Sequence, residues 1–143
     1  MTRRSDALPT RTKSSLAVRI FVSFLRAHWE VRRHPLPLAV RRLETGARRP
    51  NYYVPPKRLG TAVVGVLWLS PRKPRCLFTA LVLYRLLRAQ GDDAELVIGL
   101  HEATPSKDAH AWIEIDGVDV GPPPGRSGHV ELTRYGGNGA VTP

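Results

Sequence analysis

Cys76 is the one cysteine of the sequence, and it stands where a nucleophile would be expected. It opens an apolar segment in which Leu77, Leu81 and Tyr84 recur at helical spacing, and cationic side chains precede it. The free N–H groups of a helix's first turn and nearby cations favour the thiolate, which is the nucleophilic form of cysteine. The alternative is that Cys76 is a small buried apolar residue without a role, as most lone cysteines are.

His110 is the histidine that the sequence best places to act as a base for Cys76. It begins the segment HAWIEI, which is typical of a strand, and a strand packed on the helix would bring the imidazole to the helix's first turn. In such a pair the imidazole takes the thiol proton and later returns it to a leaving amine, which suffices for acyl transfer at neutral pH. The other histidines are interpreted as solvated or structural: His28, His34, His101 and His129.

No cofactor or metal is expected from the sequence. The histidines lack metal-site spacing, and a single cysteine excludes an intramolecular disulfide and any cysteine-built zinc or iron–sulfur centre. We therefore expect a reducing compartment, the cytoplasm. The N-terminal residues lack the apolar core of a secretory signal, and no apolar run has the length expected of a membrane span.

The elements that must position the pair follow from periodicity and from the residues that interrupt it. The segment 59–69 fits either a valine-rich strand or a buried helix, and we favour the helix. Helices are therefore predicted from Ser14 or Ser15 to Pro35, over 36–45, over 59–69 and over 76–90. The PRKP sequence at 71–74 is expected to turn the chain before the last of them.

A small antiparallel sheet is predicted after the cysteine helix. Strands are expected over 94–100 and 110–115, and Asp116-Gly117 is a strong signal for a two-residue hairpin turn before a return strand that begins at Val118. The chain that follows is rich in glycine and proline, and we expect it to be irregular. N-terminal helices, a central helix that opens with the cysteine, and a small sheet define an α+β fold.

The length of 143 residues and the 42% of hydrophobic residues fit one globular domain. We divide the chain into a basic flexible tail at 1–13 and a single domain at 14–143. Within that domain we expect a helical part at 14–70, a catalytic core at 71–122 and an irregular tail at 123–143.

Positive charge is concentrated in the first half of the chain. Of a formal net charge of +10, residues 1–75 hold 17 Lys and Arg against 3 acids, and residues 76–143 hold 5 against 9. The asymmetry indicates either solvated helix faces or a surface that docks an acidic partner. Nucleic acid is not the expected partner, because the sequence has no groove-reading motif and little aromatic interleaving among its cations.

A series of short motifs resembles one protein family. The motifs are Arg75-Cys76-Leu77, a helix ending Leu86-Leu87-Arg88, the segment AELVIG at 94–99 and the segment HAWIEIDG at 110–117. In this order, over roughly residues 70–121, they resemble the transglutaminase-like cysteine proteases of lasso-peptide biosynthesis. The short chain looks like the version in which the protease is separate from the leader-recognition protein.

The resemblance implies a papain/transglutaminase-like core and a cysteine peptidase with Cys76 as nucleophile and His110 as base. The implied reaction is removal of the leader peptide from a ribosomally made lasso-peptide precursor, before macrolactam closure. The implied partners are the precursor peptide, a leader-recognition protein and an ATP-dependent lasso cyclase. The alternative function is a catalytically impaired protease-like module that binds the precursor or a partner protein.

One position departs from the family pattern. The family places an aspartate twelve residues after the histidine, where this chain has Pro122. Asp119, the nearest acid on the return strand, is expected three or four residues along the hairpin from His110, about 10–13 Å away. The ways to orient the imidazole that stay open are a more distant acid (Asp108 or Glu131), a backbone carbonyl, a dyad without a third residue, or impaired catalysis.

Overall fold

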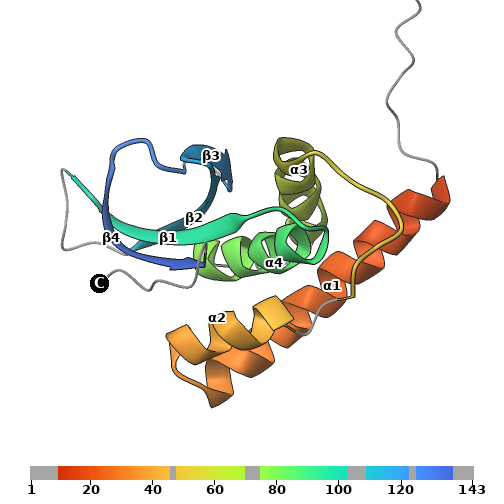
Figure 1. The fold of residues 1–143 in the computed structure, drawn as a ribbon, viewed down its shortest axis with the longest axis horizontal. Helices are drawn as coiled ribbons and strands as arrows, with labels where there is room; N and C mark the ends of the chain where they lie inside the picture. Colours follow the sequence, from red (N-terminus) through yellow and green to blue (C-terminus); the bar gives the residue numbers. More distant parts are fainter. Residues whose placement is uncertain (1–9, 46–47, 70–74, 103–108, 123–124, 137–143) are drawn as a thin grey trace, which may run out of the picture.

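Four helices and four strands form the part of the chain that the computed structural model describes, residues 10–45, 48–69, 75–102, 109–122 and 125–136 (Figure 1). The helices are α1 (Thr10–Arg33), α2 (Leu36–Thr45), α3 (Pro56–Leu67) and α4 (Cys76–Ala89). The strands are β1 (Ala94–His101), β2 (His110–Ile115), β3 (Val118–Gly121) and β4 (His129–Gly136). The expected α+β order is confirmed.

The strands form one antiparallel sheet in the order β3-β2-β1-β4, and α4 packs against its two central strands (Figure 1). α4 is apolar on nearly every side because it is enclosed, with the sheet on one side and α1, α2 and α3 on others. Its Leu81, Leu83 and Tyr84 are fully buried. Helix and sheet share one hydrophobic core, and this core fixes the start of α4 relative to β2.

The helical predictions are confirmed except at the beginning of the chain. α2 has the expected bounds, and the ambiguous segment 59–69 contributes most of α3. Gly60 lets α3 approach β3 closely, because a Cβ there would lie 2.7 Å from the Val120 carbonyl oxygen. α1 begins at Thr10, so residues 10–13 belong to this helix and not to a tail, since no proline or glycine separates them from Ser14. Residues 1–9 and the PRKP turn at 71–74 lie outside the described residues.

Strand β4 corrects the prediction of an irregular tail at 123–143. It pairs antiparallel with β1 along its length. The sequence conceals β4 because it is an edge strand with little buried surface: Val130 and Leu132 are exposed, and Tyr135 is its one buried residue. The alternation of apolar and polar residues there is short, Val130-Glu131-Leu132-Thr133, and its apolar side chains are exposed, so it does not mark a core-facing strand. Residues 123–124 and 137–143 lie outside the described residues.

A buried carboxylate fastens α1 to α2. The Glu30 side chain is fully buried, and its oxygens lie 2.9 Å from Arg26 Nη2 and 2.8 Å from Arg42 Nε, which donates a hydrogen bond to it. His34 Nε2 lies 3.6 Å away. A buried carboxylate costs free energy unless it is paired, so these contacts keep α2 against the end of α1.

Candidate active site

Cys76 is the first residue of α4, as the sequence predicts. Arg75 occupies the N-cap position and makes no side-chain cap hydrogen bond, so the first turn of α4 presents N–H groups that suit an anion. The thiol is partly exposed, and Sγ lies 3.7 Å from the carbonyl oxygen of Ala109, to which it donates a weak hydrogen bond. The thiol therefore lies beside the residue that immediately precedes His110.

His110 is the first residue of β2, and only 8% of it is exposed. Its ring donates a hydrogen bond to the backbone carbonyl of Pro122. Nε2 is buried and has no hydrogen-bond partner among the described residues, so the donor is Nδ1–H. In this tautomer the Nε2 lone pair is available to accept a proton, although the Cys76 thiol donates to the Ala109 carbonyl oxygen and not to the ring.

The hairpin of β2 and β3 keeps its acid away from His110. The turn is the predicted two-residue Asp116-Gly117 turn, with φ values of 50° and 77°. Asp119 pairs with Glu114, four residues along β2 from His110, which is the expected register. Asp119 therefore does not occupy the position that the family's aspartate would have beside the imidazole.

From the sequence, two more distant acids, Glu131 and Asp108, could orient the imidazole. Glu131 is engaged elsewhere, because it accepts hydrogen bonds of 2.8 and 3.0 Å from Arg134. Asp108 lies outside the described residues. Among the possibilities that the sequence leaves open, the backbone carbonyl is the one that the structure brings to the imidazole.

Asp119 acts on the loop that contains Pro122. Its carboxylate accepts the N–H groups of Gly121, at 2.8 Å, and of Arg126, at 2.9 Å. These two residues stand on either side of Pro122 in the chain. The acid therefore holds the loop whose carbonyl orients the imidazole, although it does not contact the ring through a hydrogen bond.

Two histidines that the sequence analysis set aside lie beside each other, and one of them, His129, lies close to His110. His101 ends β1 and His129 begins β4, and the pairing of these strands sets the two residues opposite each other. The ring centroid of His129 is 4.8 Å from that of His110 and 5.4 Å from that of His101. His129 Nδ1 lies 2.8 Å from the Ser127 carbonyl oxygen. Sequence reasoning missed this neighbour because its position depends on β4.

The surroundings of His110 lower its pKa below the usual 6.5. Burial is the largest cause, and repulsion by His129 adds to it. The Pro122 carbonyl and the Asp119 carboxylate act in the opposite direction but do not outweigh burial. The imidazole is therefore mostly neutral at pH 6.5 and above, which is the form that accepts a proton.

Trp112 supports His110 from the same strand. The two ring centroids are 6.0 Å apart with an interplanar angle of 23°, and the indole Nε1 donates to the buried carboxylate of Glu114 at 2.7 Å. Gly99 pairs with His110 across the sheet and leaves room for the indole. A Cβ at Gly99 would lie 2.8 Å from Trp112 Cη2 and 2.5 Å from the Val130 carbonyl oxygen. The sheet thus needs a glycine directly opposite His110.

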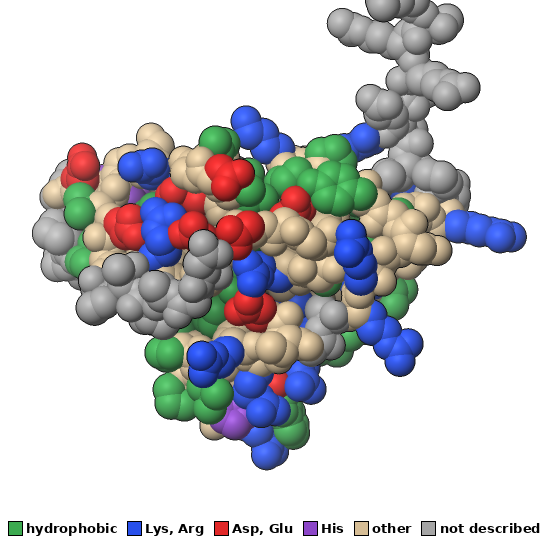
Figure 2. Space-filling view, viewed as in Figure 1, with side chains coloured by type: hydrophobic (Ala, Val, Ile, Leu, Met, Phe, Trp, Pro, Cys, Tyr) green, Lys and Arg blue, Asp and Glu red, His purple; other side chains and the backbone are tan. Residues whose placement is uncertain are grey.

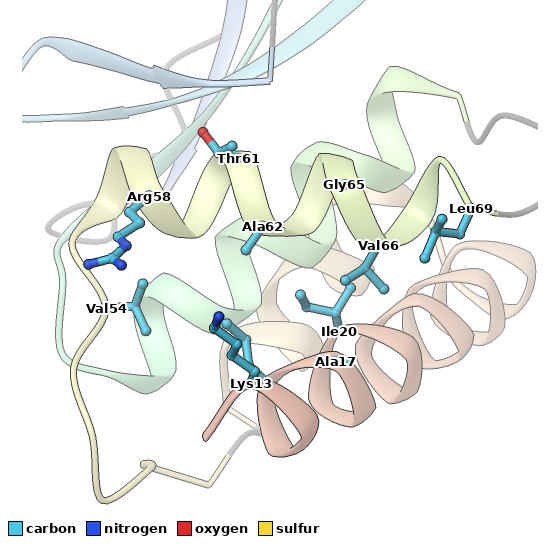
Figure 3. A pocket seen from close by; sticks show the side chains of 11 residues that line it. Lys13, Ala17, Ile20, Val54, Arg58, Thr61, Ala62, Gly65, Val66 and Leu69 are labelled. Atoms are coloured by element: carbon cyan, nitrogen blue, oxygen red, sulfur yellow. The ribbon is translucent and has the colours of Figure 1, made fainter. Parts of the chain in front are cut away.

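An apolar groove of about 460 Å³ lies between α1 and α3 (Figure 3). Ile20 of α1 and Val66 of α3 project into it, and Lys13 and Arg58 add positive charge to its lining. The lining residues include neither Cys76 nor His110. This groove is therefore separate from Cys76 and His110.

The described part of the chain contains no group of three or more His, Cys, Asp and Glu side chains placed to hold a metal ion. It also contains no helix long and apolar enough to cross a membrane.

The fold and the site define a class of protein: an α+β domain in which a helix that opens with a cysteine packs on a sheet that carries a histidine. The family model described as the transglutaminase-like superfamily matches residues 18–133. The chain belongs to this superfamily, and the transglutaminase-like core implied by the motifs is confirmed. Comparisons with curated proteins and with solved structures give no match.

Proposed function

We propose that this protein is a cysteine peptidase that removes the leader from a ribosomally made lasso-peptide precursor in the cytoplasm. The observation that carries the proposal is the meeting of α4 and β2. There the Cys76 thiol lies 3.7 Å from the carbonyl oxygen that precedes His110, and Nε2 of His110 has no partner among the described residues. Superfamily membership supports the thiol chemistry, and the motifs from Arg75 to Gly117 support the substrate class.

In the proposed reaction, His110 Nε2 takes the thiol proton while Cys76 Sγ attacks the carbonyl carbon at the end of the leader. N–H groups at the start of α4 stabilise the oxyanion that forms. The imidazolium then returns the proton to the leaving amine, which releases the core peptide, and water hydrolyses the thioester with His110 again as base. The Pro122 carbonyl holds Nδ1–H throughout, so Nε2 handles the proton in both steps.

The proposed partners follow from the same chemistry. Cleavage frees the amine of the core peptide, and this amine is the group that an ATP-dependent cyclase needs to close a macrolactam ring. Leader removal must therefore precede ring closure. A separate leader-recognition protein would present the precursor to this chain, which makes the precursor, that protein and the cyclase its three proposed partners.

The experiment that tests this function compares Cys76→Ala and His110→Ala with the unaltered protein. Each would be incubated with the cognate precursor and the recognition protein, and the products would be followed by mass spectrometry. We expect each variant to lose several orders of magnitude in cleavage rate, because nucleophile and base act as a unit. His34→Gln, a histidine change outside the site that keeps a hydrogen-bond donor near Glu30, is the matched control and should cleave normally. Normal cleavage by either site variant would exclude the proposal.

A catalytically impaired binding module is the second candidate function. It is favoured by the Pro122 carbonyl, which occupies the place of the family's aspartate and brings no negative charge to the imidazole. Thiol alkylation separates the two candidates. An activated Cys76 reacts fast near neutral pH and slows when His110 becomes alanine, whereas an inert thiol reacts slowly in both proteins.

A further inference from the structure

α1 has a second apolar face that the rest of the described chain does not cover. Its first face packs into the core through residues such as Leu16, Ile20 and Ala27. On the opposite side of the helix the exposed fractions are 62% for Val18, 51% for Val22, 54% for Leu25 and 51% for Trp29. We call these four residues the outer stripe of α1. A continuous exposed apolar patch often marks an interaction site, whereas apolar residues scattered singly over a surface do not.

The outer stripe has the spacing of a short coiled-coil seam. Its members are separated by four, three and four residues, so they alternate as the a and d positions of a heptad. The stripe ends at Arg32, the next position of the seam. Such spacing presents one straight row of side chains to a second helix lying alongside.

Arginines follow one side of the outer stripe. Arg19, Arg26 and Arg33 are seven residues apart and all fall at the e position beside the seam. Arg33 is exposed, and its guanidinium lies 3.8 Å above the ring of Trp29. Arg26 is also exposed but pairs with Glu30, and the partly buried Arg19 donates to the Arg48 carbonyl oxygen. The one acid of α1, Glu30, is fully buried between α1 and α2. The exposed surface of α1 therefore combines a seam with positive charge, and Figure 2 shows hydrophobic and basic side chains intermingled over α1 and α2.

We propose that the outer stripe of α1 docks an acidic amphipathic helix of a partner protein. The helix would place apolar side chains between Val18, Val22, Leu25 and Trp29 and would bring carboxylates to the arginine row. Charge at e and g positions selects partners in helix pairing, so a row of arginines in which Arg33 forms no ion pair among the described residues favours an acidic partner. The inference rests on α1 alone and does not depend on the proposed peptidase activity.

The same row of charge argues against two other occupants. A second copy of this chain, paired antiparallel along the stripe, would set arginine against arginine and would be repelled. A helix that lies in an anionic membrane surface is rich in Lys and Arg over its polar face, whereas on α1 the arginines follow one border of the stripe. On α1 the other border is formed by Phe21 and His28, and His28 is stacked on Phe78 of α4 at 4.0 Å.

The His28–Phe78 contact also locates the proposed docking surface. Phe78 belongs to the first turn of α4, two residues after Cys76. A helix bound along the outer stripe would therefore run past the end of α4 that carries the thiol.

The test uses two synthetic helical peptides with leucine at all a and d positions. One carries glutamate at e and g, and the matched peptide carries lysine there. Binding to the full chain would be measured by titration calorimetry and by tryptophan fluorescence, with Trp29→Phe identifying the part of the signal that comes from the stripe. We expect the glutamate peptide to bind at least about tenfold more tightly than the lysine peptide. Arg33→Glu should reduce this preference, and Leu25→Lys should weaken the glutamate peptide at least about tenfold.

Leu132→Lys is the matched control for Leu25→Lys, because Leu132 is also half exposed but lies on β4. It should bind the glutamate peptide as the unaltered chain does. Three results would overturn the proposal: equal or absent binding of the two peptides, binding to phosphatidylserine vesicles that Leu25→Lys abolishes, or a dimer of the chain that Leu25→Lys dissociates. None of these measurements uses Cys76 chemistry, so failure here is distinguishable from failure of the peptidase assay.

Discussion

A backbone carbonyl does at His110 only part of what a carboxylate would do. The Pro122 carbonyl accepts Nδ1–H and so fixes the tautomer, as an aspartate does. It carries no full negative charge to stabilise the imidazolium. In a Ser-His-Asp enzyme, loss of a working aspartate costs about 10⁴ in turnover. We expect the absence of the aspartate to reduce turnover at this site by a smaller factor, because the carbonyl still holds the tautomer.

The lowered pKa of His110 predicts the acid side of the pH profile. Burial and His129 both keep the imidazole neutral, so kcat/KM should fall only below the usual histidine pKa of 6.5. His129→Gln removes a repelling charge, so the pKa of His110 should rise and the fall in kcat/KM should move to higher pH. NMR titration of the His110 ring would measure the same shift without substrate. An unchanged titration in His129→Gln would show that His129 does not influence the base.

We expect substitution of Asp119 to reduce activity by less than substitution of a catalytic residue does. Its carboxylate holds the N–H groups of Gly121 and Arg126, and hydrogen bonds to charged groups contribute about 1.5–3 kcal/mol each. Asp119→Ala should therefore loosen the loop of Pro122 and slow cleavage by about ten- to a hundredfold. Asp119→Asn keeps one acceptor oxygen, so its cleavage rate should lie between that of Asp119→Ala and that of the unaltered protein. If Asp119→Ala were as inactive as Cys76→Ala, the acid would act directly on His110.

Gly99 of β1 pairs with both β2 and β4, so we expect the sheet to be sensitive to substitution at this position. Gly99→Ala brings a Cβ within 2.5 Å of the Val130 carbonyl and 2.8 Å of Trp112. We expect a loss of about 1–3 kcal/mol in the free energy of unfolding, with reduced activity because His110 pairs with Gly99. Thermal unfolding and the cleavage assay would measure both effects.

Gly65→Ala in α3 is the matched control for that substitution. A Cβ at Gly65 meets no atom within 4 Å, and alanine is favoured over glycine inside a helix by about 0.5–1 kcal/mol. We therefore expect Gly65→Ala to raise the melting temperature slightly. A Gly99→Ala protein as stable as the Gly65→Ala protein would mean that β4 moves aside at no cost.

Elements that carry local sequence signals could be predicted, and elements that depend on contacts with distant parts of the chain could not. α2, α4 and the β2–β3 turn carry their own periodicity, proline or Asp-Gly signals, so their positions follow from local physics. β4 has only a short alternation whose apolar side chains are exposed, so this edge strand is recognisable only once β1 is in place. The same limit hid the place of His129 beside His110, and the sequence left a backbone carbonyl as one of several possible partners for the imidazole. The positions of Cys76 and His110 follow from the helix and strand that each begins.

The two halves of the molecule differ in charge as the sequence indicates. In Figure 2 most acidic side chains lie over the sheet, whereas Lys and Arg predominate over α1 and α2. On the sheet side Arg134 binds Glu95, Glu114 and Glu131, which neutralises much of the charge there. The helical side is therefore the surface on which a net positive field acts.

This distribution predicts that salt affects association and not thiol chemistry. Binding of the proposed leader-recognition protein should weaken clearly between low and moderate salt, because exposed charges are screened over about 8–10 Å. The rate at which a small uncharged reagent alkylates Cys76 should change much less over the same range. Surface plasmon resonance and a timed alkylation series would provide the two measurements. Binding that does not respond to salt would leave the basic half as solvated surface.

The acceptor that His110 bonds at position 122 belongs to the main chain, and this limits which substitutions can remove it. Every amino acid brings the same carbonyl group, so no single codon change at this position deletes the acceptor. The proline side chain is itself buried, so a substitution there acts by moving the carbonyl and not by deleting it. The same displacement would follow from changes at residues that shape the loop, such as Asp119. The hydrogen bond to the histidine is therefore lost through changes in loop shape, including changes at a residue that makes no hydrogen bond to the ring.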